Sequence, residues 1–161
     1  MTKSKPNLFI IGAPKCGTTS MAHYLNERPD VFLCPNKEPH FFNTDLYYGK
    51  AKEKKQDVSK YLSLFDEAIN KKVIIDASVW YLYSKEATKN VLDFDPRAKF
   101  IIMLRNPVDM AISLHQQLYF NGHETQSDFE TAYNLQTERV NGGGRSQKMY
   151  RTKNTPIFTN L

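Results

Sequence analysis

The sequence predicts an α/β fold, in which helices flank a parallel sheet. Short apolar runs alternate along the chain with segments of helical pattern, and strands separated by helices pair in parallel through right-handed crossovers. The runs are continuous rather than alternating, which is typical of strands buried on both faces. The 161 residues are 40% apolar and 24% charged, as in an ordinary globular chain of one domain.

The first strand and the first helix enclose a glycine-bearing turn. The apolar run Leu8–Gly12 predicts the strand, and a helix is expected from about Thr18 to Glu27, where Arg28-Pro29 ends it. The later pattern predicts, in order, a strand at 31–33, a loop or short helix start at 37–42, a helix at 57–68 with an apolar stripe at helical spacing, a strand at 73–76 and a helix at 84–94.

A second strand-to-helix junction follows the apolar run at 99–105. Asn106 suits the N-cap and Pro107 the first position of a helix that continues to Phe120. Ser127-Asp-Phe-Glu130 matches a capping box and predicts one further helix to about residue 139. Residues 1–6 are expected to be a disordered start, and 141–161, which open with Asn-Gly-Gly-Gly, an irregular tail.

The charge, the hydropathy and the cysteine content limit the classes of ligand and the cellular location that we expect. The 22 basic and 17 acidic residues give a net charge of +5, which suits an anionic small ligand; the aromatic interleaving and zinc spacing of nucleic-acid modules are missing, so no nucleic acid is expected. No apolar run approaches the roughly 20 residues of a membrane span, and no signal peptide opens the chain. Cys16 and Cys34 form no disulfide framework, so a cytoplasmic location with reduced thiols is expected. The histidines and cysteines lack metal-ligand spacing, so no metal is expected.

The stretch Gly12-Ala-Pro-Lys-Cys-Gly-Thr-Thr19 lies between the first strand and the first helix. Glycines let the backbone approach a ligand, and successive N–H groups at a helix start face an anion. Lys15 adds a charge, and Thr18 and Thr19 add hydroxyl donors. The plainer interpretation is a tight turn in which the threonines cap the helix. Thr18 stands where a nucleotide-triphosphate loop carries its lysine, which argues against ATPase or kinase chemistry.

Three blocks together resemble the sulfotransferases that use 3′-phosphoadenosine 5′-phosphosulfate (PAPS). Pro14–Thr19 resembles their 5′-phosphosulfate loop, and Arg105-Asn-Pro followed by a helix carrying Ser113 resembles their 3′-phosphate segment. Lys37-Glu-Pro-His-Phe-Phe42 is similar to the block of the catalytic glutamate in heparan-type enzymes. The resemblance extends from about Leu8 to His123. It implies a P-loop-like nucleotide-binding architecture, PAPS as donor without a metal, and a hydroxyl or amine acceptor on a metabolite, lipid or carbohydrate.

The resemblance also implies roles for single residues. Glu38 deprotonates the acceptor, Lys15 stabilises the leaving phosphate, and Arg105 and Ser113 bind the 3′-phosphate. The donor loop that it implies is Lys15, Cys16, Gly17, Thr18 and Thr19. From the residues alone, Glu38 and His40 are both possible bases. Arg105 could instead pair with Asp109, and Ser113 could simply pack in its helix.

Two departures from the family pattern leave alternatives open. Ala77 stands where the heparan-type enzymes carry a second catalytic lysine, and the nearby Trp80, Tyr81 and Tyr83 are expected in the core or a cleft wall rather than as a sugar platform. The family's domain is longer than this chain, so a C-terminally incomplete domain is expected. The alternatives are a nucleotide kinase or NTPase with a variant phosphate loop, and a nucleotide-binding fragment without catalysis.

Overall fold

The computed structural model describes residues 4–46 and 57–140, so residues 1–3 of the predicted disordered start and the predicted tail at 141–161 lie outside the described residues. The chain divides into two compact units. The first comprises, among the described residues, 4–45 and 57–104, and it contains the whole sheet; the second comprises Leu46 and 105–140.

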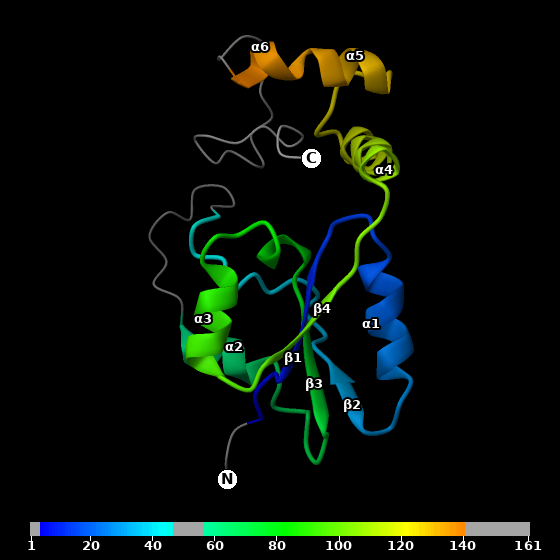
Figure 1. Ribbon diagram of the computed structural model, residues 1–161. Helices are drawn as coiled ribbons and strands as arrows, with labels where there is room; N and C mark the ends of the chain where they lie inside the picture. Colours follow the sequence, from blue (N-terminus) through cyan, green and yellow to red (C-terminus); the bar gives the residue numbers. More distant parts are fainter. Residues whose placement is uncertain (1–3, 47–56, 141–161) are drawn as a thin grey trace. The chain divides into compact units, whose positions relative to one another are not determined.

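The first unit is built on a four-stranded parallel sheet, which confirms the predicted fold class (Figure 1). The strands are β1 (Leu8–Gly12), β2 (Val31–Leu33), β3 (Val73–Ala77) and β4 (Lys99–Ile102), in the order β2-β3-β1-β4. β4 is shorter than the predicted 99–105. Two backbone hydrogen bonds nevertheless join its end to the turn after β1: Met103 N–H donates to Gly12 O at 2.8 Å, and Ala13 N–H to Met103 O at 2.7 Å.

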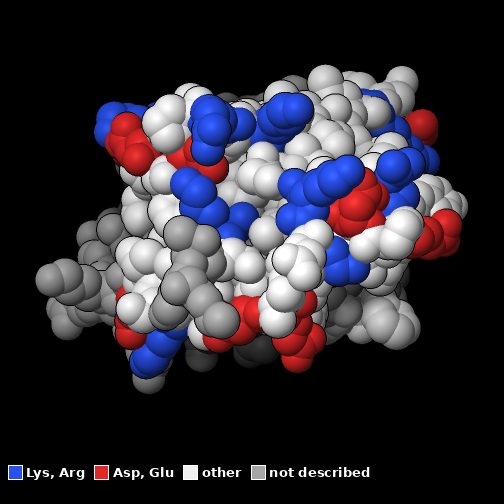
Figure 2. Space-filling view, turned by 90° about the horizontal axis from the view of Figure 1, so that it is seen from below, with Lys and Arg blue, Asp and Glu red and all other residues white. Residues whose placement is uncertain are grey.

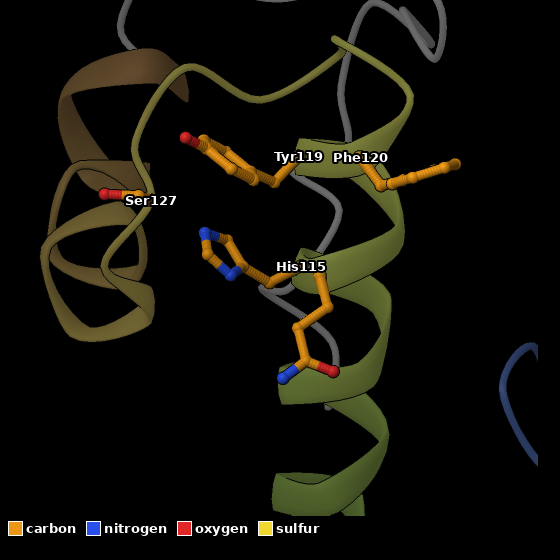
Figure 3. Close-up of a pocket in the computed structure, with 5 residues that line it drawn as sticks. His115, Tyr119, Phe120 and Ser127 are labelled. Carbon is orange, nitrogen blue, oxygen red and sulfur yellow. The ribbon is translucent and has the colours of Figure 1, made fainter.

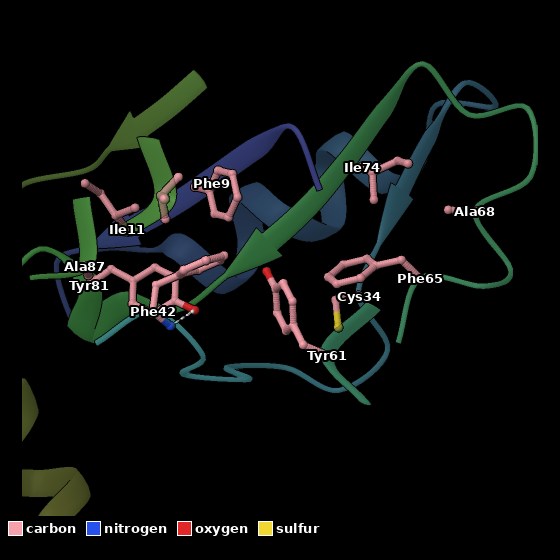
Figure 4. Close-up of a cluster of buried hydrophobic side chains, with 11 residues drawn as sticks. Phe9, Ile11, Cys34, Phe42, Tyr61, Phe65, Ala68, Ile74, Tyr81 and Ala87 are labelled. Carbon is pink, nitrogen blue, oxygen red and sulfur yellow. Dashed lines mark hydrogen bonds between the residues drawn. The ribbon is translucent and has the colours of Figure 1, made fainter. Parts of the chain in front are cut away.

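Helices cover both faces of this sheet. Ile10 faces α1 (Thr18–Asn26) and packs in one cluster with Ala22. Phe9 and Ile11 face the other side, where the core contains side chains from α2 (Val58–Ser63), the 3-10 helix η1 (Val79–Tyr81) and α3 (Ala87–Phe94) (Figure 4). Both faces of β1 are therefore buried, which explains its uninterrupted apolar run.

Two of the predicted helices of the first unit are shorter in the structure. The helix predicted at 57–68 ends at Ser63, and the one predicted at 84–94 begins at Ala87. Ser84 lies just before that helix, and its hydroxyl accepts a hydrogen bond from Ala87 N–H at 2.9 Å. Residues 37–42 form a loop, the first of the two alternatives expected there.

The second unit contains α4 (Pro107–Phe120), α5 (Phe129–Asn134) and α6 (Gln136–Val140). The Asn106 side chain accepts from Val108 N–H at 2.9 Å, which confirms the predicted cap. The predicted capping box is wrong: Asp128, not Ser127, caps α5, accepting from Thr131 N–H at 2.9 Å, and the single predicted helix is two. A carboxylate one residue later serves as the cap, and the helix accordingly begins one residue later than a cap at Ser127 would place it.

A shallow pocket of about 570 Å³ lies within the second unit, between α4 and the segment before α5 (Figure 3). The rings of His115 and Tyr119 point toward the segment that bears Ser127. His115 Nε2 donates to the Gln126 carbonyl at 2.9 Å, so this histidine joins the two segments. Below them Leu114 and Leu118 pack with Phe129.

The surface of the molecule carries charges of both signs, and its two thiols are buried. On the face seen in Figure 2, Lys and Arg side chains are interspersed with Asp and Glu. Cys16 and Cys34 are buried free thiols, and burial raises the pKa of Cys34 to about 11. Among the described residues, no helix combines the length and the apolar character that crossing a bilayer requires.

Candidate nucleotide site

The turn after β1 is fixed to two neighbouring segments of the first unit. Leu82 N–H donates to Ile11 O at 2.7 Å, while Met103 binds the other side of the turn. Gly12 has φ +149°, and a Cβ there would lie 2.7 Å from Leu82 Cβ and 2.8 Å from Val79 O. Only glycine fits this close approach, so the glycine that begins the predicted phosphate loop is required by packing.

The loop itself has the backbone of an anion site. Lys15 and Gly17 have φ values of 61° and 79°, in the left-handed region, and Gly17 is the N-cap of α1. Because this cap has no side chain, the first N–H groups of α1 remain open to an anion. Cys16 and Thr18 are buried and shape the loop, whereas Thr19 is exposed. Lys15 makes no hydrogen bond or ion pair to any residue of the described part of the chain, so its charge is available to a ligand.

The loop that carries Glu38 lies against the start of α1. Lys37 Nζ donates to Thr19 Oγ1 at 2.7 Å and lies 3.4 Å from Glu38 Oε1. The other carboxylate oxygen, Oε2, lies 3.2 Å from His40 Nε2. Two of the predicted blocks therefore meet in one place, although Lys37 and Thr19 are 18 residues apart in the sequence.

The electrostatics of this cluster favour an ionised Glu38. Burial raises the pKa of the Glu38 carboxyl, but the hydrogen bond with His40 and the charge of Lys37 lower it more, so the net pKa lies below the usual value for glutamate. The carboxylate is only partly exposed, at 27% of its side chain. It can accept a proton from a ligand that reaches it.

A buried carboxylate at the end of β3 lies beneath this loop. Asp76 is fully buried and accepts hydrogen bonds from three hydroxyls: Tyr61 at 2.7 Å, Ser78 at 2.7 Å and Tyr81 at 3.0 Å. Burial raises the pKa of Asp76, and it also raises those of both tyrosines. This cluster was not predicted from the sequence. Its one visible signal is an acidic residue at the end of a buried strand, followed closely by Ser and Tyr.

The neighbouring Ala77 faces the opposite side of the sheet. Its side chain is buried with Ile10 and Ala22 against α1. Of the aromatic residues that follow, Tyr81 is buried in the core and Tyr83 is 40% exposed. The small residue at position 77 therefore belongs to the sheet–helix packing.

Arg105 and Ser113, predicted to bind a 3′-phosphate, both belong to the second unit. Arg105 is exposed, and its Nε lies 3.9 Å from Asp109 Oδ2, the ion pair foreseen as an alternative. An exposed pair of this length is weak, so the guanidinium can exchange this partner for an anion. Ser113 is half-buried on α4. Among the described residues no three His, Cys, Asp or Glu side chains cluster as metal ligands do.

Several known proteins resemble this chain in sequence, and one solved structure resembles it in fold. Residues 5–150 match the sulfotransferase domain family. Human heparan sulfate glucosamine 3-O-sulfotransferase 6 is 30% identical over 112 residues, which are 70% of this chain and 30% of that protein. Mouse carbohydrate sulfotransferase 15 is 29% identical over 163 residues, 76% of this chain and 28% of that protein. The crystal structure of a sulfotransferase from Alicyclobacillus acidocaldarius superposes with a TM-score of 0.76 at 35% identity, covering 86% of this chain and 60% of that one. The chain thus spans less than a third of these curated relatives.

Proposed function

The chain belongs to the sulfotransferase domain family, and on that premise we propose that it transfers a sulfuryl group from PAPS to a hydroxyl or amine acceptor. The observation that carries the proposal is the meeting of the phosphate loop and Glu38 through Lys37, which contacts both. It brings an unpaired cation, an open helix start and a carboxylate to one edge of a parallel sheet, where α/β folds bind ligands.

The residues divide the reaction between them. Glu38 takes the proton of the acceptor as its oxygen or nitrogen forms a bond to sulfur. The bond from sulfur to the 5′-phosphate oxygen breaks, and its electron pair stays on that oxygen. Lys15 and the N–H groups at the start of α1 stabilise the negative charge that develops there. Glu38 is ionised at neutral pH and is therefore able to accept the proton, and its position beside the phosphate loop, rather than its pKa, supports the role of base.

The remaining assignments rest on the family pattern. Arg105 and Ser113 bind the 3′-phosphate, and Thr18 and Thr19 complete the donor loop with Cys16 and Gly17. The role of His40 rests instead on its 3.2 Å contact with Glu38, through which it orients the carboxylate. The acceptor is a carbohydrate, lipid or metabolite. The names of two relatives, which mention heparan sulfate and carbohydrate, favour the first of these classes.

Two substitutions test the proposal. Lys15→Ala should lower the transfer rate by roughly 10²–10³-fold, the scale seen when one charge-stabilising donor is lost. Lys89→Ala removes an exposed lysine that pairs with Asp93 on the same helix, and should leave the rate unchanged. Glu38→Gln should abolish transfer and retain nucleotide binding, since only the base is altered. The measurement is transfer from labelled PAPS to an acceptor panel; near-normal turnover of Lys15→Ala would exclude Lys15 from the mechanism.

A thermal-shift titration separates this proposal from the two alternatives. Stabilisation by 3′-phosphoadenosine 5′-phosphate, and not by ATP or GTP, supports a PAPS site. Preferential stabilisation by Mg-ATP would instead favour a kinase or NTPase with a variant loop. Selective binding without transfer to any acceptor would favour a nucleotide-binding fragment.

A further inference from the structure

Three successive backbone amides of the Glu38 loop are bound by two buried hydroxyls. His40 N–H donates to Ser78 Oγ at 3.3 Å. Phe41 N–H and Phe42 N–H donate to the Tyr81 hydroxyl oxygen at 2.9 Å and 3.3 Å, and the second of these bonds is drawn in Figure 4. The two hydroxyls follow β3, whereas the three amides follow β2. The loop is therefore attached to the neighbouring strand connection.

Asp76 sets the direction of these hydrogen bonds. A hydroxyl has one proton and two lone pairs, so it can donate to a carboxylate oxygen and still accept from an amide. Ser78 and Tyr81 both point their protons at Asp76, so their lone pairs are left facing the loop amides. Without an acceptor at this position, the two hydroxyls would rotate to other partners and hold the loop amides less firmly.

The loop needs such an attachment because its backbone is strained. Glu38 and His40 have φ values of 60° and 51°, in the left-handed region that side chains other than glycine rarely adopt. Strain of this kind persists only where the surroundings hold it. The Glu38–His40 contact at 3.2 Å joins the two strained residues.

We propose that Asp76, acting through Ser78 and Tyr81, is a positioning residue that holds Glu38 in the geometry required for proton transfer. The inference rests on the proposed function, in which Glu38 is the base. Asp76 is fully buried and acts only through other groups. It accepts the protons of the Ser78 and Tyr81 hydroxyls, and these hydroxyls in turn accept from the backbone amides of residues 40–42, which holds the loop in place.

The chain offers a matched pair of variants to test this role. Tyr81→Phe and Tyr61→Phe each delete one buried hydroxyl that donates to Asp76 Oδ2, and each keeps the ring. Only Tyr81 also binds the loop amides, whereas Tyr61 stacks its ring on Phe41, a contact that phenylalanine preserves. Tyr81→Phe also leaves two loop amides without their acceptor, so it should lose more melting temperature than Tyr61→Phe. A purely structural role for the cluster would lower the stability of both variants without moving the pKa of Glu38.

Two readouts distinguish positioning from stability in the full chain without needing activity. Hydrogen exchange at His40, Phe41 and Phe42 should accelerate at least tenfold in Tyr81→Phe and stay near wild type in Tyr61→Phe. The carboxyl pKa of Glu38, followed by NMR titration, should rise in Tyr81→Phe because the contact with His40 is loosened. Asp76→Asn should change exchange and the pKa of Glu38 in the same direction but less than Tyr81→Phe, since its amide keeps one acceptor oxygen where the carboxylate has two. Equal exchange and equal Glu38 titration in the two tyrosine variants would overturn the proposal.

Activity then separates the two levels of inference. If the wild-type chain transfers sulfuryl groups, Tyr81→Phe should lower kcat by about 10–100-fold with little change in KM for PAPS, because misplacement of a catalytic group by about 1 Å has effects of this size. Tyr61→Phe should lie within about threefold of wild type. An inactive wild-type chain would contradict the proposed function, while the exchange and titration data would still decide the role of Asp76. An active Tyr81→Phe variant with normal kcat would refute the positioning role alone.

Discussion

The substitution Gly12→Ala tests how tightly the phosphate loop is packed against η1. The added Cβ would lie 2.7 Å from Leu82 Cβ and 2.8 Å from Val79 O, whereas ordinary van der Waals contacts begin at 3.4 Å. Neither obstacle is the end of a flexible side chain, so the relief must come from the backbone. Gly12 also has φ +149°, a conformation that alanine adopts only with strain.

The expected cost follows from these two effects. Backbone strain of this kind costs about 1–3 kcal/mol, and overpacking in a close-packed core costs about 1–3 kcal/mol. The two combine to about 2–6 kcal/mol, a large share of the roughly 5–15 kcal/mol that stabilises a typical domain. Gly12→Ala should therefore shift the unfolding equilibrium by more than tenfold.

The matched control is Gly17→Ala in the same loop. Gly17 has φ +79°, but its added Cβ would meet only Met103 Cε, at an ordinary 3.6 Å. This variant should lose only about 1–2 kcal/mol of its free energy of unfolding, which is the cost of placing alanine in the left-handed region. Urea unfolding followed by fluorescence gives both free energies, with equal slopes required for the comparison. If Gly12→Ala costs no more than Gly17→Ala, the close approach to η1 does not constrain the loop.

Two further predictions concern charges. Lys37→Met removes a charge that lowers the pKa of Glu38, so the acid limb of kcat/KM, measured across pH, should move to higher pH; an unchanged limb would show that the two groups do not interact in solution. Arg139→Met leaves buried Glu124 without its bidentate partner at 2.7 and 3.0 Å, which should destabilise the second unit by about 2–4 kcal/mol in denaturant unfolding at pH 7. The loss should shrink as pH falls through the lowered pKa of Glu124, because the wild-type pair is then lost too; Lys89→Met, which breaks an exposed pair, should change stability little.

The fold follows from local signals in the sequence to a large extent. The parallel sheet was predictable because strands such as Leu8–Gly12 are buried on both faces and therefore read as continuous apolar runs. The cap at Asn106 was predictable because Asn is a preferred N-cap residue and the proline after it suits the first position of a helix. The cap of α5 was not, because Ser127 and Asp128 compete for nearby amides and the sequence pattern does not rank them.

The candidate site is predictable only in its parts. The phosphate loop and the Glu38 block each carry a local pattern, but their contact is made by Lys37, whose reach to Thr19 depends on where β2 ends relative to α1. The Asp76 cluster is less visible still. Tyr81 and Ser78 are near Asp76 in the sequence, but Tyr61 comes from α2, 15 residues away. Such networks depend on packing between elements, which periodicity and capping rules do not encode.

The segment that follows β3 links the two halves of the candidate site. Leu82 binds the end of β1 through its N–H group, and Val79 and Leu82 enclose Gly12, so this segment sets the start of the phosphate loop. Ser78 and Tyr81, interleaved with them in the sequence, hold the loop of the candidate base. Interleaved residues of one short turn thus contact both the phosphate loop and the loop that carries Glu38. A displacement of this turn would move the phosphate loop and the Glu38 loop together. The distance between the two loops should therefore change less than the position of either loop.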